Sequence, residues 1–268
     1  MTHNHTKNDS TISFALQQKL NVMRAVVLRD MRSRFFNHGL GFLVQSIWPL
    51  AHIFVLIIIY KLAGRSAAYG ESVTLFFATA LLPTMSFMYI SRFMCLSLIL
   101  NRQMLSFQAV KIVDIMFARA FLEIMAAFLT LFLTFVILLI WGDDPFPADP
   151  TQAVLAYLSS LLLGVGIGSL AGVVVMFFEL FATIYALFMV IIYITSGIVF
   201  VAPLMPKIVG DVLSWSPVFG CVEWMRTAYY PSYPDQFVDK FYIVGVGISS
   251  VLLGLLLERM FRRQIMEG

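Results

Sequence analysis

Five or six long apolar runs with few charges fill most of this chain. Hydrophobic residues make up 60% of its 268 residues and charged residues only 12%, and the mean hydropathy is +0.88. A water-soluble domain of this length cannot cover so much apolar surface, whereas a helix of about 20 apolar residues crosses the hydrocarbon core of a bilayer. The sequence therefore predicts an all-α integral membrane protein.

Hydropathy divides the main part of the chain, residues 37–258, into six expected membrane spans. They run over about residues 40–62, 73–98, 115–141, 153–178, 180–201 and 241–257. The second span contains Pro83, which predicts a kink. The fourth contains Gly164, Gly168 and Gly172, and this spacing lines one helix face with small residues that let another backbone approach closely. That neighbouring backbone can belong to the same chain or to a second copy.

Two segments outside the spans have patterns of their own. Residues 14–36, which follow a polar tail at 1–13, combine an apolar stripe at helical spacing with many basic residues. This pattern predicts an amphipathic helix that lies in the membrane interface. Residues 203–233 are apolar but broken by Pro and Gly, which predicts two half-inserted, re-entrant helices, around Lys207 to Leu213 and Phe219 to Tyr229.

The distribution of charge predicts the orientation. Most of the 18 Lys and Arg residues lie in the N-terminal segment, after the second span, and in a basic tail at 259–268. The opposite loops carry Asp143, Asp144 and Asp149. Because basic loops stay in the cytoplasm, both termini are expected there, in a multi-pass protein of the inner (plasma) membrane. Cys95 and Cys221 then lie near opposite faces, so we expect them to be unpaired.

The sequence lacks the patterns of an enzyme. It contains no glycine-rich loop ending in Lys-Ser or Lys-Thr, no His, Cys or carboxylate cluster with metal-ligand spacing, and no nucleophile–base set. We therefore expect no catalytic residue, no metal and no cofactor in this chain. Glu123 and Glu179 lie near span ends rather than at mid-membrane, which favours energy from a partner protein over coupling to an ion gradient.

Polar and aromatic residues in or beside the spans are candidates for a substrate path. The basic ones could attract an anionic substrate, although Arg92 could equally extend to lipid phosphates. The aromatic ones before the last span could form platforms for sugar rings, or belong to the aromatic belt of a membrane surface. The candidates are Arg24, Arg29, Arg32, Arg34, Trp48, His52, Arg92, Trp215, Phe219, Trp224, Tyr229 and Tyr230.

The amphipathic segment 101–114 follows the second span on the expected cytoplasmic side. It can be a plain connecting loop, or a short coupling helix seated in a groove of a soluble motor protein. For the second interpretation the contact residues are Asn101, Arg102, Met104, Leu105, Phe107, Lys111 and Asp114.

Two stretches carry a family resemblance. The run VMRAVVLRDMRSRFFNHGLGFLVQSIWPLAHI, Val22 to Ile53, resembles the N-terminus of ABC-2 type permeases that export polysaccharides, in particular the capsular polysaccharide branch. The run NRQMLSFQAVKIVDIMFARAFLE, Asn101 to Glu123, is similar to that family's loop between spans two and three. The segment before the last span is similar to its re-entrant helices.

The resemblance implies partners as well as a function. It implies a homodimer that binds two copies of a separate subunit, which itself binds ATP and Mg, and no nucleic acid. It further implies a periplasmic co-polymerase, an outer-membrane polysaccharide exporter and a lipid-linked acidic polysaccharide as substrate. The expected function is export of lipid-linked capsular polysaccharide; the alternatives are export of O-antigen, teichoic acid or a small drug, or a non-transporting membrane scaffold or assembly protein.

Overall fold

The computed structural model describes residues 17–31, 41–107 and 109–267, and all regular secondary structure in these ranges is helical. Residues 17–31 are helical throughout. The long helices are α2 (Gly41–Leu62), α3 (Val73–Leu100), α4 (Ile112–Ile140), α5 (Pro150–Phe177) and α9 (Lys240–Glu267). The shorter ones are η1 (Arg102–Ser106), α6 (Phe181–Thr195), η2 (Ala202–Leu204), α7 (Lys207–Leu213) and α8 (Pro217–Tyr229).

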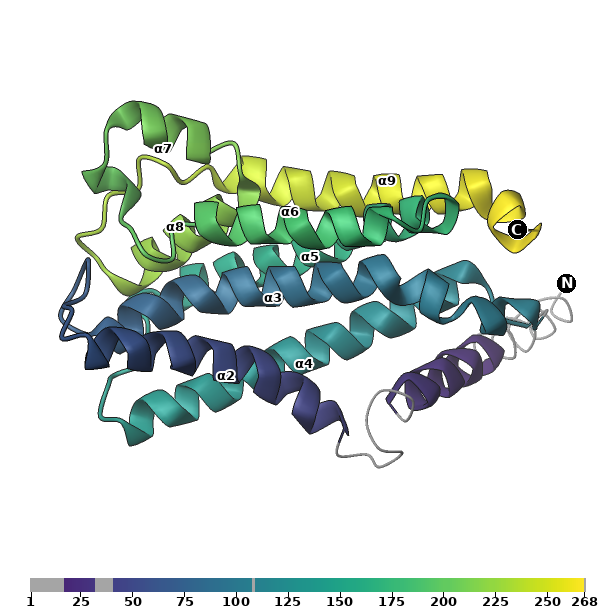
Figure 1. Cartoon of the computed structure of the whole chain (residues 1–268), viewed down its shortest axis with the longest axis horizontal. Helices are drawn as coiled ribbons and strands as arrows, with labels where there is room; N and C mark the ends of the chain where they lie inside the picture. The colour runs from purple at the N-terminus through teal and green to yellow at the C-terminus, as the bar shows by residue number, and fades with distance from the viewer. Residues whose placement is uncertain (1–16, 32–40, 108, 268) are drawn as a thin grey trace, which may run out of the picture.

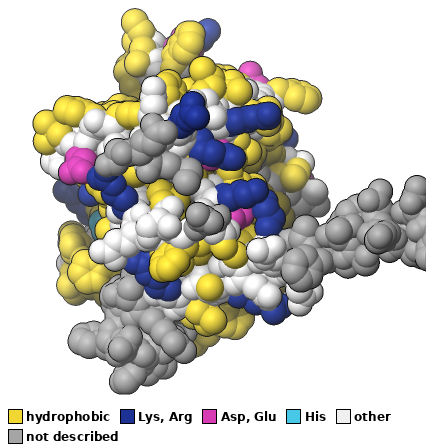
Figure 2. Space-filling view, turned by 90° about the vertical axis from the view of Figure 1, so that its right-hand side faces the viewer, with side chains coloured by type: hydrophobic (Ala, Val, Ile, Leu, Met, Phe, Trp, Pro, Cys, Tyr) yellow, Lys and Arg dark blue, Asp and Glu magenta, His cyan; other side chains and the backbone are white. Residues whose placement is uncertain are grey.

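The long helices form an elongated bundle and run roughly along its long axis (Figure 1). Residues 17–31, η1 and the last turns of α9 lie at one end of this bundle, and α7 and α8 lie at the other. Lys and Arg side chains gather on the first end (Figure 2). We call it the basic end, and the opposite one the α7–α8 end.

The centre of the bundle is the packing of α3 against α5. In the apolar part of α3, 78% of the residues are buried, compared with 28% in α2 and in α9. Gly164, Gly168 and Gly172 all face α3: a Cβ added at Gly168 would lie 2.7 Å from the Ser91 backbone, and one at Gly172 would lie 2.9 Å from the Met94 carbonyl oxygen. The glycine face therefore serves packing within the chain, one of the two alternatives that the sequence left open.

This close packing predicts a contrast between two glycine-to-alanine substitutions. Gly168→Ala should lower the free energy of unfolding by about 1–3 kcal/mol, because the added methyl overpacks the contact with α3. Gly245→Ala in α9 is the matched control, since its Cβ would meet no atom of the described residues within 4 Å. Thermal unfolding in detergent measures both. Equal unfolding midpoints for the two variants would show that α3 and α5 can move apart without loss of stability.

Five helices are long and apolar enough to cross a membrane: Val44–Leu62, Val73–Leu100, Ile112–Ile140, Pro150–Phe177 and Lys240–Ile265. The prediction of an all-helical membrane protein is confirmed. The expected span at 180–201 corresponds to α6, which ends at Thr195 and measures about 22 Å at 1.5 Å per residue. That is short of a hydrocarbon core of about 30 Å. Six spans, and the insertion of α7 and α8 into the membrane, stay predictions.

Two expected boundaries differ from the structure. The basic tail at 259–268 is not separate from the last span, because α9 continues to Glu267. Segment 101–114 is not one coupling helix: only Arg102–Ser106 form a short 3-10 helix, and α4 begins at Ile112. The Asp114 carboxylate accepts a hydrogen bond from the Lys111 backbone N–H at 3.1 Å and so caps α4. The tail 1–13, and the ends of the helix expected at 14–36, lie outside the described residues.

Candidate functional site

A groove runs over α3 with α2 and α6 as its walls. Its cavity holds about 410 Å³ and is lined mainly by apolar side chains. The polar residues in the lining are His52 from α2, Tyr89 and Arg92 from α3, and Tyr193 from α6. The structure thus brings together His52 and Arg92, which the sequence indicated separately.

Methionines supply much of the apolar lining of this groove, namely Met85, Met88 and Met189. Their unbranched thioether side chains adapt to ligands of different shapes. Trp48 belongs to the same helix as His52 but lies exposed outside the cavity lining. The groove therefore suits an elongated ligand that is partly apolar and carries a few polar or charged groups.

Two polar contacts connect the walls and floor of the groove. The His52 Nε2 and Tyr193 hydroxyl atoms lie 3.1 Å apart, and the two rings meet edge to face. On the floor, the Arg92 guanidinium donates a hydrogen bond to the backbone carbonyl of Ala182 in the first turn of α6. The sequence could not indicate Tyr193 or Ala182, because one is an ordinary residue of an apolar run and the other acts through its backbone.

Helical residues 17–31 are attached to the basic end by polar contacts. Arg29 donates to the Asn101 side-chain oxygen at 2.9 Å, and Lys19 lies 3.7 Å from the Asp114 carboxylate. Arg24 is exposed, and Arg32 and Arg34 lie outside the described residues. Two of the residues expected to contact a motor protein, Asn101 and Asp114, are thus buried and hold this helical segment instead.

A buried ionic network lies beneath that attachment. Arg119 in α4 forms ion pairs with Asp30 at 2.9 Å and with Glu123 at 3.1 Å. Gln45 of α2 donates to Glu123 at 2.6 Å, and the Arg119 guanidinium lies over the Phe93 ring of α3. The spacing of Arg119 and Glu123 indicated their common helix face, but the partners from three other segments came only from the fold.

The remaining residues of the expected coupling segment differ in exposure. Arg102, Phe107 and Lys111 are exposed, Met104 is half-buried and Leu105 is buried. The exposed residues lie beside η1 at the basic end, where Figure 2 shows other Lys and Arg side chains. An exposed phenylalanine among basic side chains is a suitable contact for an acidic protein surface.

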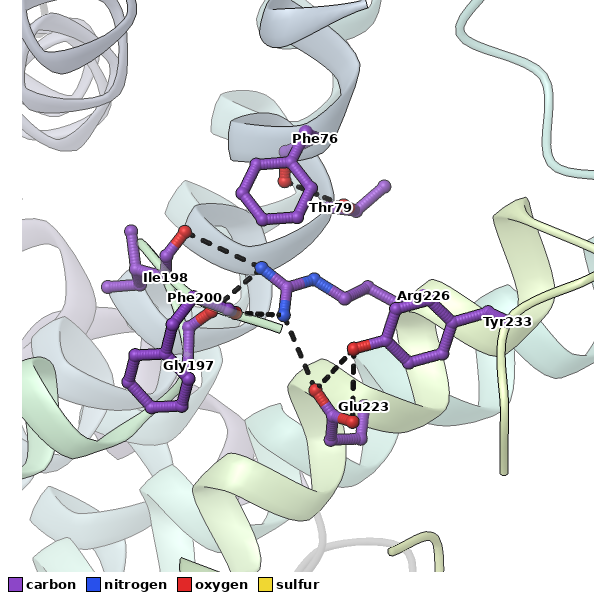
Figure 3. A network of polar contacts seen from close by, with 8 residues as sticks. All are labelled: Phe76, Thr79, Gly197, Ile198, Phe200, Glu223, Arg226 and Tyr233. Carbon is purple, nitrogen blue, oxygen red and sulfur yellow. Dashed lines mark hydrogen bonds and ion pairs between the residues drawn. The ribbon is translucent and has the colours of Figure 1, made fainter. Parts of the chain in front are cut away.

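A second buried network lies at the α7–α8 end (Figure 3). Arg226 of α8 donates to the carbonyls of Gly197 at 2.7 Å and Phe200 at 2.9 Å, and its guanidinium lies 4.3 Å from the centre of the Phe76 ring. Arg226 also donates to the Ile198 carbonyl at 3.5 Å and pairs with Glu223 at 3.3 Å, and Glu223 accepts a hydrogen bond from the Tyr233 hydroxyl at 2.9 Å.

Burial raises the pKa of the Glu223 carboxyl, and the neighbouring Arg226 opposes this shift most strongly. Both side chains are fully buried, so the cluster is internal structure and offers no surface to a ligand. Its effect is to join the end of α6 to α8 and α3. No sequence pattern indicates this cluster, since the acceptors are mostly backbone carbonyls.

The aromatic residues before the last span do not form one ligand platform. Phe219 and Trp224 are buried in the bundle, and Trp224 donates to Gln152 of α5 at 2.9 Å. Tyr229 and Tyr230 are half-buried, and only Trp215 is highly exposed, at 79%. In this conformation Phe219 and Trp224 pack within the protein, so sugar rings cannot stack along all five side chains. A contact of sugar rings with the other three side chains stays a prediction.

The groove contains few polar groups. Within residues 17–31, 41–107 and 109–267, no group of three His, Cys, Asp or Glu side chains is placed to hold a metal ion. Cys95 and Cys221 are buried and free. The groove contributes one cation, one imidazole and two phenols in apolar surroundings.

No protein-family model matches the chain. It is 28% identical over 242 residues to the polysialic acid transport protein KpsM of Escherichia coli, covering 90% of this chain and 93% of that protein. It is 24% identical over 244 residues to the capsule polysaccharide export inner-membrane protein CtrC of Neisseria meningitidis, covering 91% and 92%. It is 21% identical over 255 residues to the protein of the same description, BexB, of Haemophilus influenzae, covering 94% and 95%. The resemblance to polysaccharide export permeases is confirmed.

Proposed function

We propose that this chain is the membrane permease of an ATP-driven exporter that moves lipid-linked capsular polysaccharide across the inner membrane, with the α2–α3–α6 groove as part of the path. The observation that carries the proposal is the likeness, along nine tenths of the chain, to three proteins named for polysaccharide or polysialic acid transport. The groove, with its cation and adaptable apolar lining, supports it.

A homodimer accounts for the open side of the groove. His52 and Arg92 are polar residues in largely apolar helices, and polar groups that face lipid tails are unfavourable. The outer surfaces of α2 and α6 expose apolar residues such as Ile47 and Leu187. Two copies that meet through these helices would cover both grooves and enclose a passage between them.

The basic end is the proposed site of coupling to two copies of an ATP-binding subunit, on the cytoplasmic side. The charge distribution supports this orientation, with both termini inside. When the ATPase dimer closes on ATP and Mg, it pushes η1, the short helix that connects α3 to α4 along the chain. The push reorients α2, α3 and α6 around the dimer axis, while basic residues of the N-terminal helix attract the anionic lipid end of the glycan.

The six-span topology belongs to this proposal. The short helix α6, continued by residues 196–201, forms the fifth span, and α7 and α8 return toward the same outer surface. The burial of α8 supports its re-entrant position: its Glu223 and Arg226 are fully enclosed by protein, as non-spanning backbone at membrane depth requires. A periplasmic co-polymerase and an outer-membrane exporter would continue the path from the α7–α8 end.

The coupling step predicts the behaviour of Phe107. Phe107→Ala should reduce the amount of ATPase that purifies with the permease several-fold, because an aromatic anchor at an interface carries much of its binding energy. The side chain is 63% exposed, so its truncation should leave the thermal stability unchanged. Phe241→Ala is the matched control, since Phe241 is 92% exposed at the start of α9, away from the basic end. Equal losses of ATPase in both variants would contradict coupling through η1.

The same purified complex separates the alternatives. Turnover of the ATPase that responds to a capsular glycan and not to O-antigen, teichoic acid or a small drug supports the first choice. A non-transporting scaffold predicts that no glycan changes the turnover, and that glycan export continues when the ATPase is inactive.

A further inference from the structure

Helix α6 has an arginine contact at each end and few buried residues between them. Of its residues only Tyr185 and Met189 are buried, although all of this helix is described. At its first turn, Arg92 donates to the Ala182 carbonyl. Beyond its last residue, Thr195, Arg226 donates to the Gly197 and Phe200 carbonyls.

The two attachments differ in how easily they can be broken. Ala182 lies inside the helix, where its carbonyl also accepts the regular bond from the N–H four residues later, so loss of Arg92 leaves it satisfied. The Gly197 and Phe200 carbonyls lie beyond the helix, where no helical N–H follows to bond them. Removing Arg226 would therefore leave buried acceptors unpaired, whereas removing Arg92 would not.

The chain also leaves the α-helical conformation at the second attachment. Gly197 has φ +84°, a left-handed conformation that other residues rarely adopt, and it is the point where α6 gives way to irregular backbone. Arg226 itself is fixed by Glu223 and by the Phe76 ring. The end of α6 near Gly197 is thus attached more firmly than its first turn.

Arg92 faces the groove as well as Ala182. A phosphate is a stronger acceptor for a guanidinium than a neutral carbonyl is, because it is charged and two of its oxygens can accept two parallel N–H bonds. We propose that the phosphate of a lipid entering the groove accepts hydrogen bonds from Arg92 in place of the Ala182 carbonyl. The first turn of α6 is then released, while Arg226 holds the other end of α6 as a pivot. This inference rests on the proposed function, because it assumes that an anionic lipid occupies the groove.

The phosphate can come from a membrane phospholipid or from the lipid anchor of a glycan, and the experiment has an arm for each. Nitroxide labels at Val44 and Thr183 report the distance between α2 and the first turn of α6, and labels at Val55 and Ile194 report it near the pivot. All four side chains are exposed in the single chain, and the two native cysteines are buried. Labelled chains are mixed with an excess of unlabelled chains, so that each dimer carries one labelled copy. The chain is placed in phosphatidylcholine nanodiscs, alone, with phosphatidic acid, or with undecaprenyl phosphate.

The expected result is a shift to longer distances for Val44–Thr183 when a phosphate lipid is added, with Val55–Ile194 unchanged. A response to both lipids means that any lipid phosphate suffices, and a response to undecaprenyl phosphate alone identifies a polyprenyl phosphate as the source. In Arg92→Gln the distances should no longer respond to either lipid. Arg226→Lys is the second variant, and it should broaden the Val55–Ile194 distribution without phosphate.

The inference is overturned if neither lipid changes the first distance, if Arg92→Gln responds like the native chain, or if both pairs move together. Its failure is distinct from failure of the proposed function, because the distances are measured without ATPase or export. Glycan export by a chain whose α6 does not respond to phosphate lipids would reject only the exchange of Arg92 between Ala182 and phosphate. A responsive α6 in a chain that exports no glycan would reject only the proposed function.

Discussion

Replacing Arg226 with alanine is expected to cause one of the largest losses of stability that a single substitution can produce in this chain. The change removes the donor for carbonyls beyond α6 and leaves the Glu223 carboxyl in a fully buried site without its cation. Breaking a buried ion pair by removing one partner costs about 3–5 kcal/mol. We expect a much lower unfolding midpoint in detergent and strongly reduced protein in the membrane.

The conservative variant separates charge from geometry. Arg226→Lys keeps the positive charge, but an ammonium group cannot present the planar fork that reaches both Glu223 and the carbonyls, so an intermediate loss is expected. In the double variant Arg226→Met with Glu223→Gln, no charge remains buried, and part of the stability should return. The matched control is Thr227→Ala, whose hydroxyl bonds only to the Trp224 carbonyl one turn earlier in the same helix. A native midpoint for Arg226→Ala would refute the role of this cluster.

The sequence predicted the features of this molecule that depend on local composition. Long apolar runs require a bilayer, so five of the spans could be placed before the structure was known. Arg119 and Glu123 are four positions apart and so share a helix face, where the structure shows them as an ion pair. The short helices α7 and α8 fall where Pro and Gly break the apolar pattern.

The features that the sequence could not predict depend on contacts between distant segments. Arg119 and Asp30 are 89 positions apart, and nothing in either segment indicates the other. The early end of α6 was missed because residues 180–201 are uniformly apolar, while the left-handed Gly197 and the carbonyls held by Arg226 decide where the helix stops. The helix expected at 101–114 is shorter in the structure, because an amphipathic pattern does not show that Asp114 caps the next helix.

The candidate site shows the same division. His52 and Arg92 are candidates because a polar residue in an apolar span is unfavourable in lipid unless it has a function or a partner. Both line the groove. Phe219 and Trp224 were chosen because aromatic residues suit sugar rings, yet both serve the packing of α8. A charged or polar residue in a span is unfavourable in lipid and so carries information, whereas an aromatic residue is equally suited to a core, an interface or a ligand.

The second large effect is expected at the basic end, where two ion pairs join residues 17–31 to α4. Arg119→Met should lower the free energy of unfolding by about 3–5 kcal/mol, because it removes a buried cation from between the Asp30 and Glu123 carboxylates. Arg119→Met should also detach residues 17–31 from the bundle. Amide hydrogen exchange in this segment should then become faster, toward the rate of a helix without tertiary contacts.

The other ion pair of this segment provides the control. Lys19 lies 3.7 Å from Asp114, but its side chain is 55% exposed, and exposed pairs contribute about 0–1 kcal/mol. Lys19→Met should therefore change neither the unfolding midpoint nor the exchange by much. The triple variant Asp30→Asn, Arg119→Met and Glu123→Gln leaves no buried charge in the network and should regain stability relative to Arg119→Met. If Lys19→Met were as damaging as Arg119→Met, burial would not be the property that fixes this segment. If Arg119→Met left exchange at residues 17–31 unchanged, the attachment would rest on Arg29 and Asn101 instead.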